Sequence, residues 1–418
     1  SSADPAFWQH MVNFTVGLGV SGTLTELPTG TDSWPNPTSD ATKIDDLWHA
    51  AVNSRGDFFS AAYPTTFANA LSDALSSIID RTGSASAVAA SSTQLKTNGR
   101  LYQAKFNSGN WSGQLLSIPI DDEGVEGPVE WDAGAVINTH APASRVILTK
   151  GSSGDGEEFL YGNLNVVQKA ALDNNAAGSA DDCGLERVAY LRGEATNEGI
   201  SGTFSCVSAS IVDKFRSRTS KLGDIVNSGP IYVGEPNAGY SDLDHAGYAA
   251  FSADSASNNG YKRRTPMVYV GANDGTLHGF NACIAGVTPG CTAADEGKEL
   301  IAYIPSMVYA NLSRLTDKDY NASHRYFVDG SPMLADANTG TTPLPVWKSV
   351  LVGSLNAGGQ GYFALDVTNP TDTTKTAPTF APASVATLLL WELSSADDAD
   401  RGYTHNLPPT DRSTGQAS

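Results

Sequence analysis

The residues of this 418-residue chain that could do chemistry are short acidic runs, a few histidines and four cysteines. Asp397, Asp398 and Asp400 place three carboxylates close together, and calcium prefers oxygen ligands of this kind. Calcium also needs about six to eight oxygens from a loop that wraps around it. Because Arg401 and Gly402 follow directly, we interpret the run as a surface turn and keep its three aspartates only as weak metal candidates. The run at Asp121–Gly124 is interpreted as a hairpin turn for the same reason.

Three histidines are candidates for acid–base catalysis, namely His245, His278 and His324. None of them lies near a nucleophile motif, and the pattern G-x-S-x-G does not occur in the sequence. We therefore interpret them as hydrogen-bonded structural residues and predict no catalytic residue. No glycine-rich run is followed by G-K-S/T, so the sequence predicts no cofactor-binding residue either.

The cysteines form two sequence-local pairs, Cys183 with Cys206 and Cys283 with Cys291. Metal ligation is disfavoured because no C-x-x-C spacing occurs and few histidines are nearby. We therefore predict one disulfide within each pair. Since disulfides persist in oxidising compartments, the chain is expected outside the cytosol.

The sequence argues against nucleic-acid binding and against a transmembrane segment. The net charge of −19 disfavours nucleic acid, because nucleic-acid affinity comes largely from Lys and Arg that neutralise phosphates. No run reaches the roughly 18 consecutive apolar residues of a membrane helix, so no transmembrane segment is predicted.

The elements that must position these residues follow a repeat. In Pro266–Ala282 the run V-Y-V-G leads into the turn Asn273-Asp274-Gly275 and then into a second strand-like run, which predicts a tight hairpin. The same design returns in Ser349–Val367. A strand with G-P or G-S-P precedes each hairpin, and an aromatic strand follows it. The residues that define the repeat are Gly229, Pro230, Gly271, Asp274, Gly275, Gly330, Pro332, Gly353, Gly361 and Asp366.

Four antiparallel strands in each repeat are typical of a β-propeller blade. The equivalent glycines Gly271 and Gly353 lie 82 residues apart (353 − 271), compared with roughly 40 to 50 residues for a compact propeller repeat, so long insertions are expected. Residues 100–106, 111–120 and 129–131 indicate an incomplete first blade. Since a propeller needs about four to eight blades, the ring is expected to be completed by residues beyond 418 or by another chain.

The first 82 residues follow a different pattern, with strand, helix, strand and helix in that order. The strands are expected at 11–20 and 57–59, and the second helix carries Phe67, Leu71, Leu75 and Ile78 at helical spacing. This part resembles the final third of a von Willebrand A-type domain, but the D-x-S-x-S metal loop of such domains does not occur. The expected organisation is an A-type remnant at 1–82, a connector at 83–98 and a partial propeller at 99–418, in a mainly β chain.

Several longer segments, taken together, resemble the PilY-like family of type IV pilus biogenesis factors and tip adhesins. They stand in one order along the chain: Thr15–Leu24, Ile44–Asn53, Trp111–Leu115, Tyr190–Glu194, Phe215–Pro230, Val268–Phe280, His324–Pro332 and Leu355–Val367. The resemblance implies a protein exported through the periplasm to the pilus tip or outer cell surface, which contacts minor pilins and a host or abiotic surface. It also implies a role in pilus assembly and extension, surface adhesion and twitching motility, without enzymatic activity.

The resemblance leaves calcium and two other functions to be weighed. The family's acidic calcium loop lies downstream of the segments found here, so no cofactor is predicted for this chain and calcium is expected only in the following part. One alternative is a quinone-cofactor (PQQ-type) dehydrogenase with similar blades, but its adjacent Cys-Cys pair is missing from the sequence. A generic secreted carbohydrate-binding propeller is the other alternative.

Overall fold

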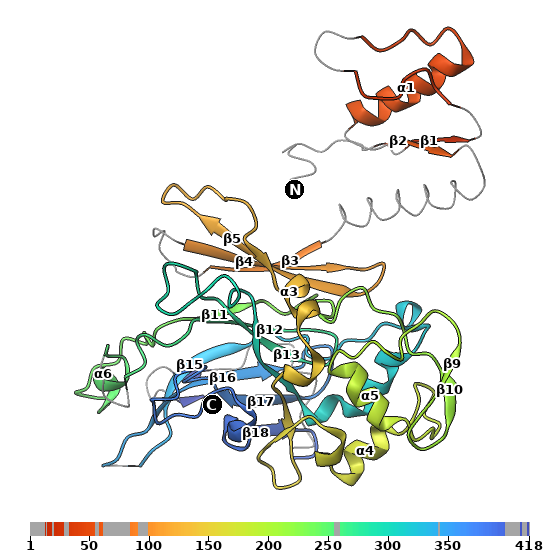
Figure 1. Cartoon of the computed structure of the whole chain (residues 1–418). Helices are drawn as coiled ribbons and strands as arrows, with labels where there is room; N and C mark the ends of the chain where they lie inside the picture. Colours follow the sequence, from red (N-terminus) through yellow and green to blue (C-terminus); the bar gives the residue numbers. More distant parts are fainter. Residues whose placement is uncertain are drawn as a thin grey trace. The chain divides into compact units, whose positions relative to one another are not determined.

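The computed structural model describes residues 13, 15–18, 21–28, 33–54, 58–61, 84–90, 99–254, 260–341, 343–397, 410–411 and 416–417. The chain divides into two compact units, Ser1–Gly83 and Ser84–Ser418 (Figure 1). Each unit is described by itself below.

The first unit contains a strand, a helix and a second strand. Strands β1 (Thr15–Leu18) and β2 (Phe58–Ala61) pair in parallel, and helix α1 (Asp40–Asn53) connects them along the chain. The helix begins at Asp40 because Ser39 and Thr42 form a reciprocal cap, in which each side chain accepts a hydrogen bond from the other residue's backbone N–H. The expected strand–helix–strand order is thus confirmed, and the helix expected around Phe67–Ile78 lies outside the described residues.

The second unit begins with a four-stranded antiparallel sheet, here called sheet one. Its strands in spatial order are β3 (Ser84–Ala90), β4 (Gly99–Asn107), β5 (Ser112–Ile120) and β6 (Trp131–Asp132). The prediction of a connector over 83–98 was wrong for its first half, because residues 84–90 pair with β4 along their length. The run S-A-S-A-V-A-A lacks the bulky residues that indicate a strand in isolation, and its partner strand supplies them. The first blade therefore has four strands rather than three.

Sheet two contains the blade predicted around the hairpin of Pro266–Ala282. Strands β11 (Ile231–Val233), β12 (Met267–Gly271), β13 (Leu277–Asn281) and β14 (Glu299–Ile304) pair antiparallel in the predicted order. Two strands that the sequence did not predict extend this sheet. Strand β7 (Ile147–Lys150) pairs in parallel with β14, and β8 (Gly156–Glu158) pairs with β7.

Sheet three contains the blade predicted around the hairpin of Ser349–Val367. Its strands are β15 (Met333–Asn338), β16 (Trp347–Ser354), β17 (Gly361–Asp366) and β18 (Leu389–Ser394), paired antiparallel in that order. The two repeats read from the sequence are thus two sheets of the same design, which confirms the blade prediction.

The core shows that the three sheets stack face to face. Strand β12 is fully buried, and its alternate side chains enter two different clusters. Val268 and Val270 pack with Tyr102 and Leu115 of sheet one, whereas Met267 and Tyr269 belong to the cluster that contains Phe363 and Leu365 of sheet three. Successive side chains of a strand point to opposite faces of its sheet, so sheet two lies between the other two.

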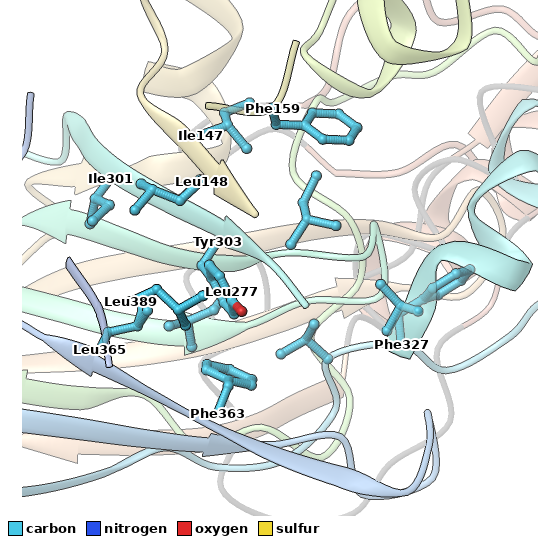
Figure 2. Close-up of a cluster of buried hydrophobic side chains, with 14 of the residues drawn as sticks. Ile147, Leu148, Phe159, Leu277, Ile301, Tyr303, Phe327, Phe363, Leu365 and Leu389 are labelled. Atoms are coloured by element: carbon cyan, nitrogen blue, oxygen red, sulfur yellow. The ribbon is translucent and has the colours of Figure 1, made fainter. Parts of the chain in front are cut away.

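Figure 2 shows the larger cluster. Tyr303 on β14 approaches Phe363 on β17 with ring centroids 4.9 Å apart. Ile147 and Leu148 of β7 enter the same cluster and are almost fully buried, as is Phe159, which follows β8. The insertion that carries β7 and β8 therefore contributes to the core rather than hanging from the surface.

The remaining elements connect the blades. The helices are α3 (Ala133–Thr139), α4 (Val166–Leu172), α5 (Gly184–Leu191), α6 (Tyr248–Phe251), α7 (Tyr309–Leu312) and α8 (Val385–Leu388). Short 3-10 helices span Pro142–Ser144, Tyr161–Asn163, Ser306–Val308, Ser313–Thr316, Tyr320–Ala322 and Pro382–Ser384. Two further hairpins pair β9 (Thr203–Ser205) with β10 (Ile211–Asp213), and β19 (Thr410–Asp411) with β20 (Gln416–Ala417). Among the described residues, no helix has the length and apolar character needed to cross a membrane.

Candidate functional site

The hairpin of sheet two contains a histidine with two acidic partners. His278 lies on β13 with no solvent exposure, and its Nε2 atom is 3.0 Å from the Asp274 carboxylate in the preceding turn. Its Nδ1 atom is 2.7 Å from the Glu299 carboxylate on the neighbouring strand β14. Burial alone would lower the pKa of His278, but the two carboxylates outweigh it and raise the pKa to about 9. The imidazole is therefore protonated at neutral pH and donates from both nitrogens.

A buried arginine completes this network. Arg145 precedes β7, and its Nε and Nη2 atoms donate to the two carboxylate oxygens of Glu299 at 2.6 and 2.9 Å. Burial would raise the pKa of Glu299, but Arg145 and His278 lower it to about 2. Asp274 in turn accepts a hydrogen bond from the backbone N–H of Gly223 at 2.8 Å. The two positive and two negative charges balance, as a buried ionic group requires.

This network can stabilise the fold but is poorly arranged for catalysis. Each of its charged groups already has a partner of opposite charge, and the histidine at its centre is sealed from solvent. His324 also has an acidic partner, since its Nε2 atom is 2.9 Å from the Asp224 carboxylate. Its ring stacks on Trp111 with ring centroids 3.7 Å apart. The His245 ring contacts the Tyr240 ring in a tilted arrangement, with centroids 4.5 Å apart. The structure does not bring the three histidines together.

At two positions of the repeat motif a glycine is required, because another part of the same chain lies too close for a side chain. A Cβ atom on Gly271 would lie 2.2 Å from the backbone oxygen of Val328, and one on Gly353 would lie 2.2 Å from the ring of Phe363. Gly275 has a φ of +93°, which completes the tight turn after Asp274. These residues thus determine how the blades pack.

The G-P and G-S-P segments meet at the junction between sheets two and three. The Asn227 side chain and backbone both donate to Asp329, at 2.7 and 3.2 Å. The Gly229 N–H donates to the Ser331 hydroxyl at 2.7 Å, and the Ser228 hydroxyl donates to the Gly330 carbonyl at 3.0 Å. Equivalent motif residues of the two repeats therefore bind one another. Pro230 and Pro332 stand directly before β11 and β15, each of which is an end strand of its sheet.

The other motif residues also have structural partners. The Asp366 carboxylate, at the end of β17, accepts from the backbone of Thr368 at 3.0 Å and lies 3.0 Å from the Lys348 amine. A Cβ atom on Gly361 would lie 2.7 Å from the backbone oxygen of Leu393 on β18. None of these contacts forms a ligand site within the described part of the second unit.

Of the weak metal candidates, only Asp397 lies among the described residues, and Asp398 and Asp400 lie outside them. The Asp397 carboxylate accepts from the backbone N–H and the hydroxyl of Ser394 at 2.8 and 2.9 Å. It thus caps the turn that follows β18. In the earlier acidic run, Asp121 caps a turn in the same way, with its carboxylate accepting from the N–H groups of Glu123 and Val125.

Both predicted disulfides are present. The bond between Cys183 and Cys206 links the start of α5 to the end of β9, and the bond between Cys283 and Cys291 closes a short loop between β13 and β14. Among the described residues, Cys183, Cys206 and Glu186 form a group with the spacing of metal ligands. Because both sulfur atoms belong to the disulfide, they are not free thiolates that could bind a metal.

The sequence did not predict a site at the basic segment Arg216–Lys221. Arg216, Arg218 and Lys221 line a pocket together with Trp111 and the turn residue Asp274. The run F-R-S-R-T-S-K was visible in the sequence, but its meaning depends on which other segments surround it. That information is available only from the tertiary structure.

Comparison with known proteins places this architecture in a family. Residues 222–406 match the family model described as the PilY1 beta-propeller domain. The type IV pilus biogenesis factor PilY1 of Pseudomonas aeruginosa strain UCBPP-PA14 is 36% identical over 449 aligned residues, which cover 98% of this chain and 34% of that protein. A PilY1 homolog from Xylella fastidiosa is 33% identical, with 90% of this chain and 26% of the relative covered.

A solved structure also matches part of the chain. The crystal structure of the P. aeruginosa PilY1 C-terminal domain is 34% identical and covers 43% of this chain and 28% of that one, with a TM-score of 0.26. The chain spans about a third of the length of the P. aeruginosa relative, for which the covered share is 34%.

Proposed function

We propose, from the premise that this chain belongs to the PilY1 family of type IV pilus biogenesis factors, that it is a non-enzymatic component of a type IV pilus. It would act at the pilus tip or outer cell surface and support pilus assembly and extension, surface adhesion and twitching motility. The observation that carries the proposal is the similarity to PilY1 along 98% of the chain.

The distribution of charged groups in the structure supports a role without catalysis. The histidine with the strongest acidic surroundings, His278, is buried in a neutral network with Arg145, Asp274 and Glu299. A catalytic acid or base must reach a substrate proton directly or through one water molecule, and a side chain with no exposure does not meet this condition. The quinone-dependent dehydrogenase is not the favoured function, because the adjacent Cys-Cys pair of such enzymes is missing from the sequence.

The insertions between the predicted blade strands support a role in binding. Residues 151–224 carry helices α4 and α5 and the hairpin of β9 and β10. The Cys183–Cys206 disulfide links the start of α5 to this hairpin. Loops held by a rigid scaffold are common sites of recognition. We propose that these surfaces contact minor pilins on one side and a host or abiotic surface on the other.

The experiment is deletion of the gene followed by complementation. The strains are scored for surface pili, twitching and attachment, and the protein is located by gold labelling. Complementation with the unchanged gene is expected to restore all three properties, with label at pilus tips. Gly353→Val, which would drive a side chain into Phe363, is expected to fail, whereas Gly162→Ala, at a position with open space around it, should complement fully. Normal pili and attachment in the deletion strain, with label scattered in the periplasm, would contradict the proposal.

A further inference from the structure

The segment between α5 and β11 places three cations around one small pocket. Arg216, Arg218 and Lys221 line it, together with Thr219, Ser220 and Trp111. Among the described residues that line the pocket, Asp274 is the only acidic one, and its carboxylate is already bound to His278 and to the Gly223 N–H. Three cations and one carboxylate thus line the pocket, in a chain whose net charge is −19.

Two of the three cations have partners that fix them in place. The Arg218 guanidinium donates to Glu198 at 2.6 and 2.9 Å and lies 3.5 Å from the ring centroid of Tyr190. The Lys221 amine donates to the backbone carbonyls of His140 and Asn138 at 2.6 and 3.2 Å. These carbonyls orient the amine but carry no net charge, so the positive charge of Lys221 is not neutralised by them.

Arg216 is the cation whose bonding is incomplete. Its backbone N–H donates to the Thr316 carbonyl, and its guanidinium lies 4.4 Å from the ring centroid of Tyr320. Its Nε and Nη1 atoms are buried, and neither has a hydrogen-bond acceptor among the described residues. Burial of a charged donor without an acceptor is costly, and such a group needs an explanation in a native structure.

The neighbouring hydroxyls are also able to donate. Thr219 Oγ1 accepts from the Asn110 side chain at 2.9 Å, and Ser220 Oγ accepts from the Leu222 N–H at 3.2 Å. A hydroxyl that accepts one bond still carries its own proton. In the described part of the chain, neither proton is donated to a protein acceptor. The residues that line the pocket therefore include several donors that have no protein acceptor in the described part of the chain.

We propose that this pocket binds a single oxyanion group, a carboxylate or a phosphate, with Arg216 as its principal donor. A planar guanidinium forms strong charge-assisted hydrogen bonds with such groups. The pocket has room for little more than one water-sized group, so it could admit an oxygen of such an anion but no extended ligand. The anion would enter as a free ion or as the charged end of a larger molecule. This inference does not depend on the proposed pilus function.

The test is calorimetric titration of the 418-residue chain with sodium phosphate and, separately, with sodium acetate. Chloride keeps the ionic strength constant, so that general screening of the acidic surface does not contribute. At least one of the two anions is expected to bind with one-to-one stoichiometry. Binding of acetate alone would identify a carboxylate ligand, and binding of phosphate alone would identify a phosphate ligand.

Arg216→Gln is expected to weaken this binding about tenfold or more, because it removes the charge-assisted hydrogen bonds. Arg263→Gln makes the same change of charge at a side chain that is 72% exposed and paired with Asp254, and should leave the affinity unchanged. Failure of both anions to bind, or equal affinity in the Arg216 variant, would overturn the inference.

A second measurement covers the case in which Arg216→Gln does not fold. The unchanged chain is treated with phenylglyoxal, which modifies arginine, in the presence and absence of the anion, and the peptide carrying Arg216 is quantified by mass spectrometry. The anion should protect Arg216 and leave modification of Arg263 unaltered. Equal modification of Arg216 under both conditions would also overturn the inference.

Discussion

The buried histidine of the β12–β13 hairpin predicts an unusual dependence of stability on pH. The perturbation is His278→Gln, which removes the positive charge between Asp274 and Glu299 but keeps a side chain able to hydrogen-bond. In the folded chain the pKa of His278 is about 9, compared with 6.5 for an unperturbed histidine. The difference of 2.5 (9 − 6.5) corresponds to on the order of 3 kcal/mol of folding free energy.

The sign follows from linkage between proton binding and folding. Because the folded pKa is higher than the unfolded one, the folded state binds the proton more tightly. The stabilisation is therefore fully present below pH 6.5 and is lost as the pH rises through 9. The free-energy difference between the unchanged chain and His278→Gln should consequently be largest near neutral pH or below and shrink in alkaline solution.

The assay is urea unfolding of both proteins at several pH values across this range, followed by tryptophan fluorescence. His245→Gln is the matched control, since it removes a histidine whose ring contacts Tyr240 and that does not belong to the network. Its effect on the free energy of unfolding should not follow the same pH dependence. A difference between the unchanged chain and His278→Gln that stays constant from pH 6 to pH 10 would refute the protonated state of His278 derived from the geometry.

Three further predictions concern the packing, the disulfides and calcium. Gly271→Ala should destabilise the chain by about 1–3 kcal/mol in urea unfolding, because its Cβ would meet the Val328 carbonyl, whereas Gly162→Ala should be nearly neutral; equal effects would contradict the packing argument. Replacing Cys183 and Cys206 by Ser should lower the free energy of unfolding by about 3 kcal/mol, because the disulfide spans a separation of 23 residues. Loss of Cys283–Cys291, with its separation of 8, should lower it by less, and similar unfolding midpoints for the two variants would contradict this ranking. Calorimetry should find no micromolar calcium site in residues 1–418; such a site, lost when Asp397, Asp398 and Asp400 become Ala, would show that the C-terminal turn was misinterpreted.

The sequence predicted those parts of the fold that repeat or alternate. The strands around V-Y-V-G and V-L-V-G were located because each hairpin carries its own turn signal, such as Asn273-Asp274-Gly275. Strand β3 was missed because its small residues are no different in composition from those of a connector. Strands β7 and β8 were missed because β7 pairs with β14, more than 150 residues further along the chain, as the register of Ile147 with Ala302 shows.

The site was less predictable than the fold for a related reason. The disulfides could be assigned because each pair is local in the sequence. The partners of His278 could not, since Arg145 reaches Glu299 across 154 positions, and no local pattern marks either residue as charged and buried. The orphan donors of Arg216 are equally hidden, because an arginine in a polar run is ordinarily a solvated surface residue.

The segment V-Y-V-G-A-N-D-G-T-L-H-G-F can now be understood as a junction between blades. Gly271 admits the Val328 backbone, and the Asn273 side chain donates to Asp224 at 2.8 Å while accepting from the Phe327 N–H at 2.9 Å. Asp274 holds His278. Each polar residue of the motif that we traced is bound to another part of the same chain, often far away in sequence.

It follows that substitutions in this motif should act mainly through folding, except at Asp274, which also lines the pocket of Arg216. A loss of piliation caused by Gly271→Ala would therefore say little about which surface binds a pilin, because the blades themselves would be disturbed. Variants that can distinguish loss of binding from loss of folding must change side chains that the chain does not need in order to fold. The insertion hairpin of β9 and β10 meets this requirement, since its exposed side chains Val207 and Ile211 are 80% and 72% accessible and do not belong to the buried clusters. A functional screen should therefore begin with such positions, with the unfolding midpoint measured for each variant before any defect in attachment is assigned to binding.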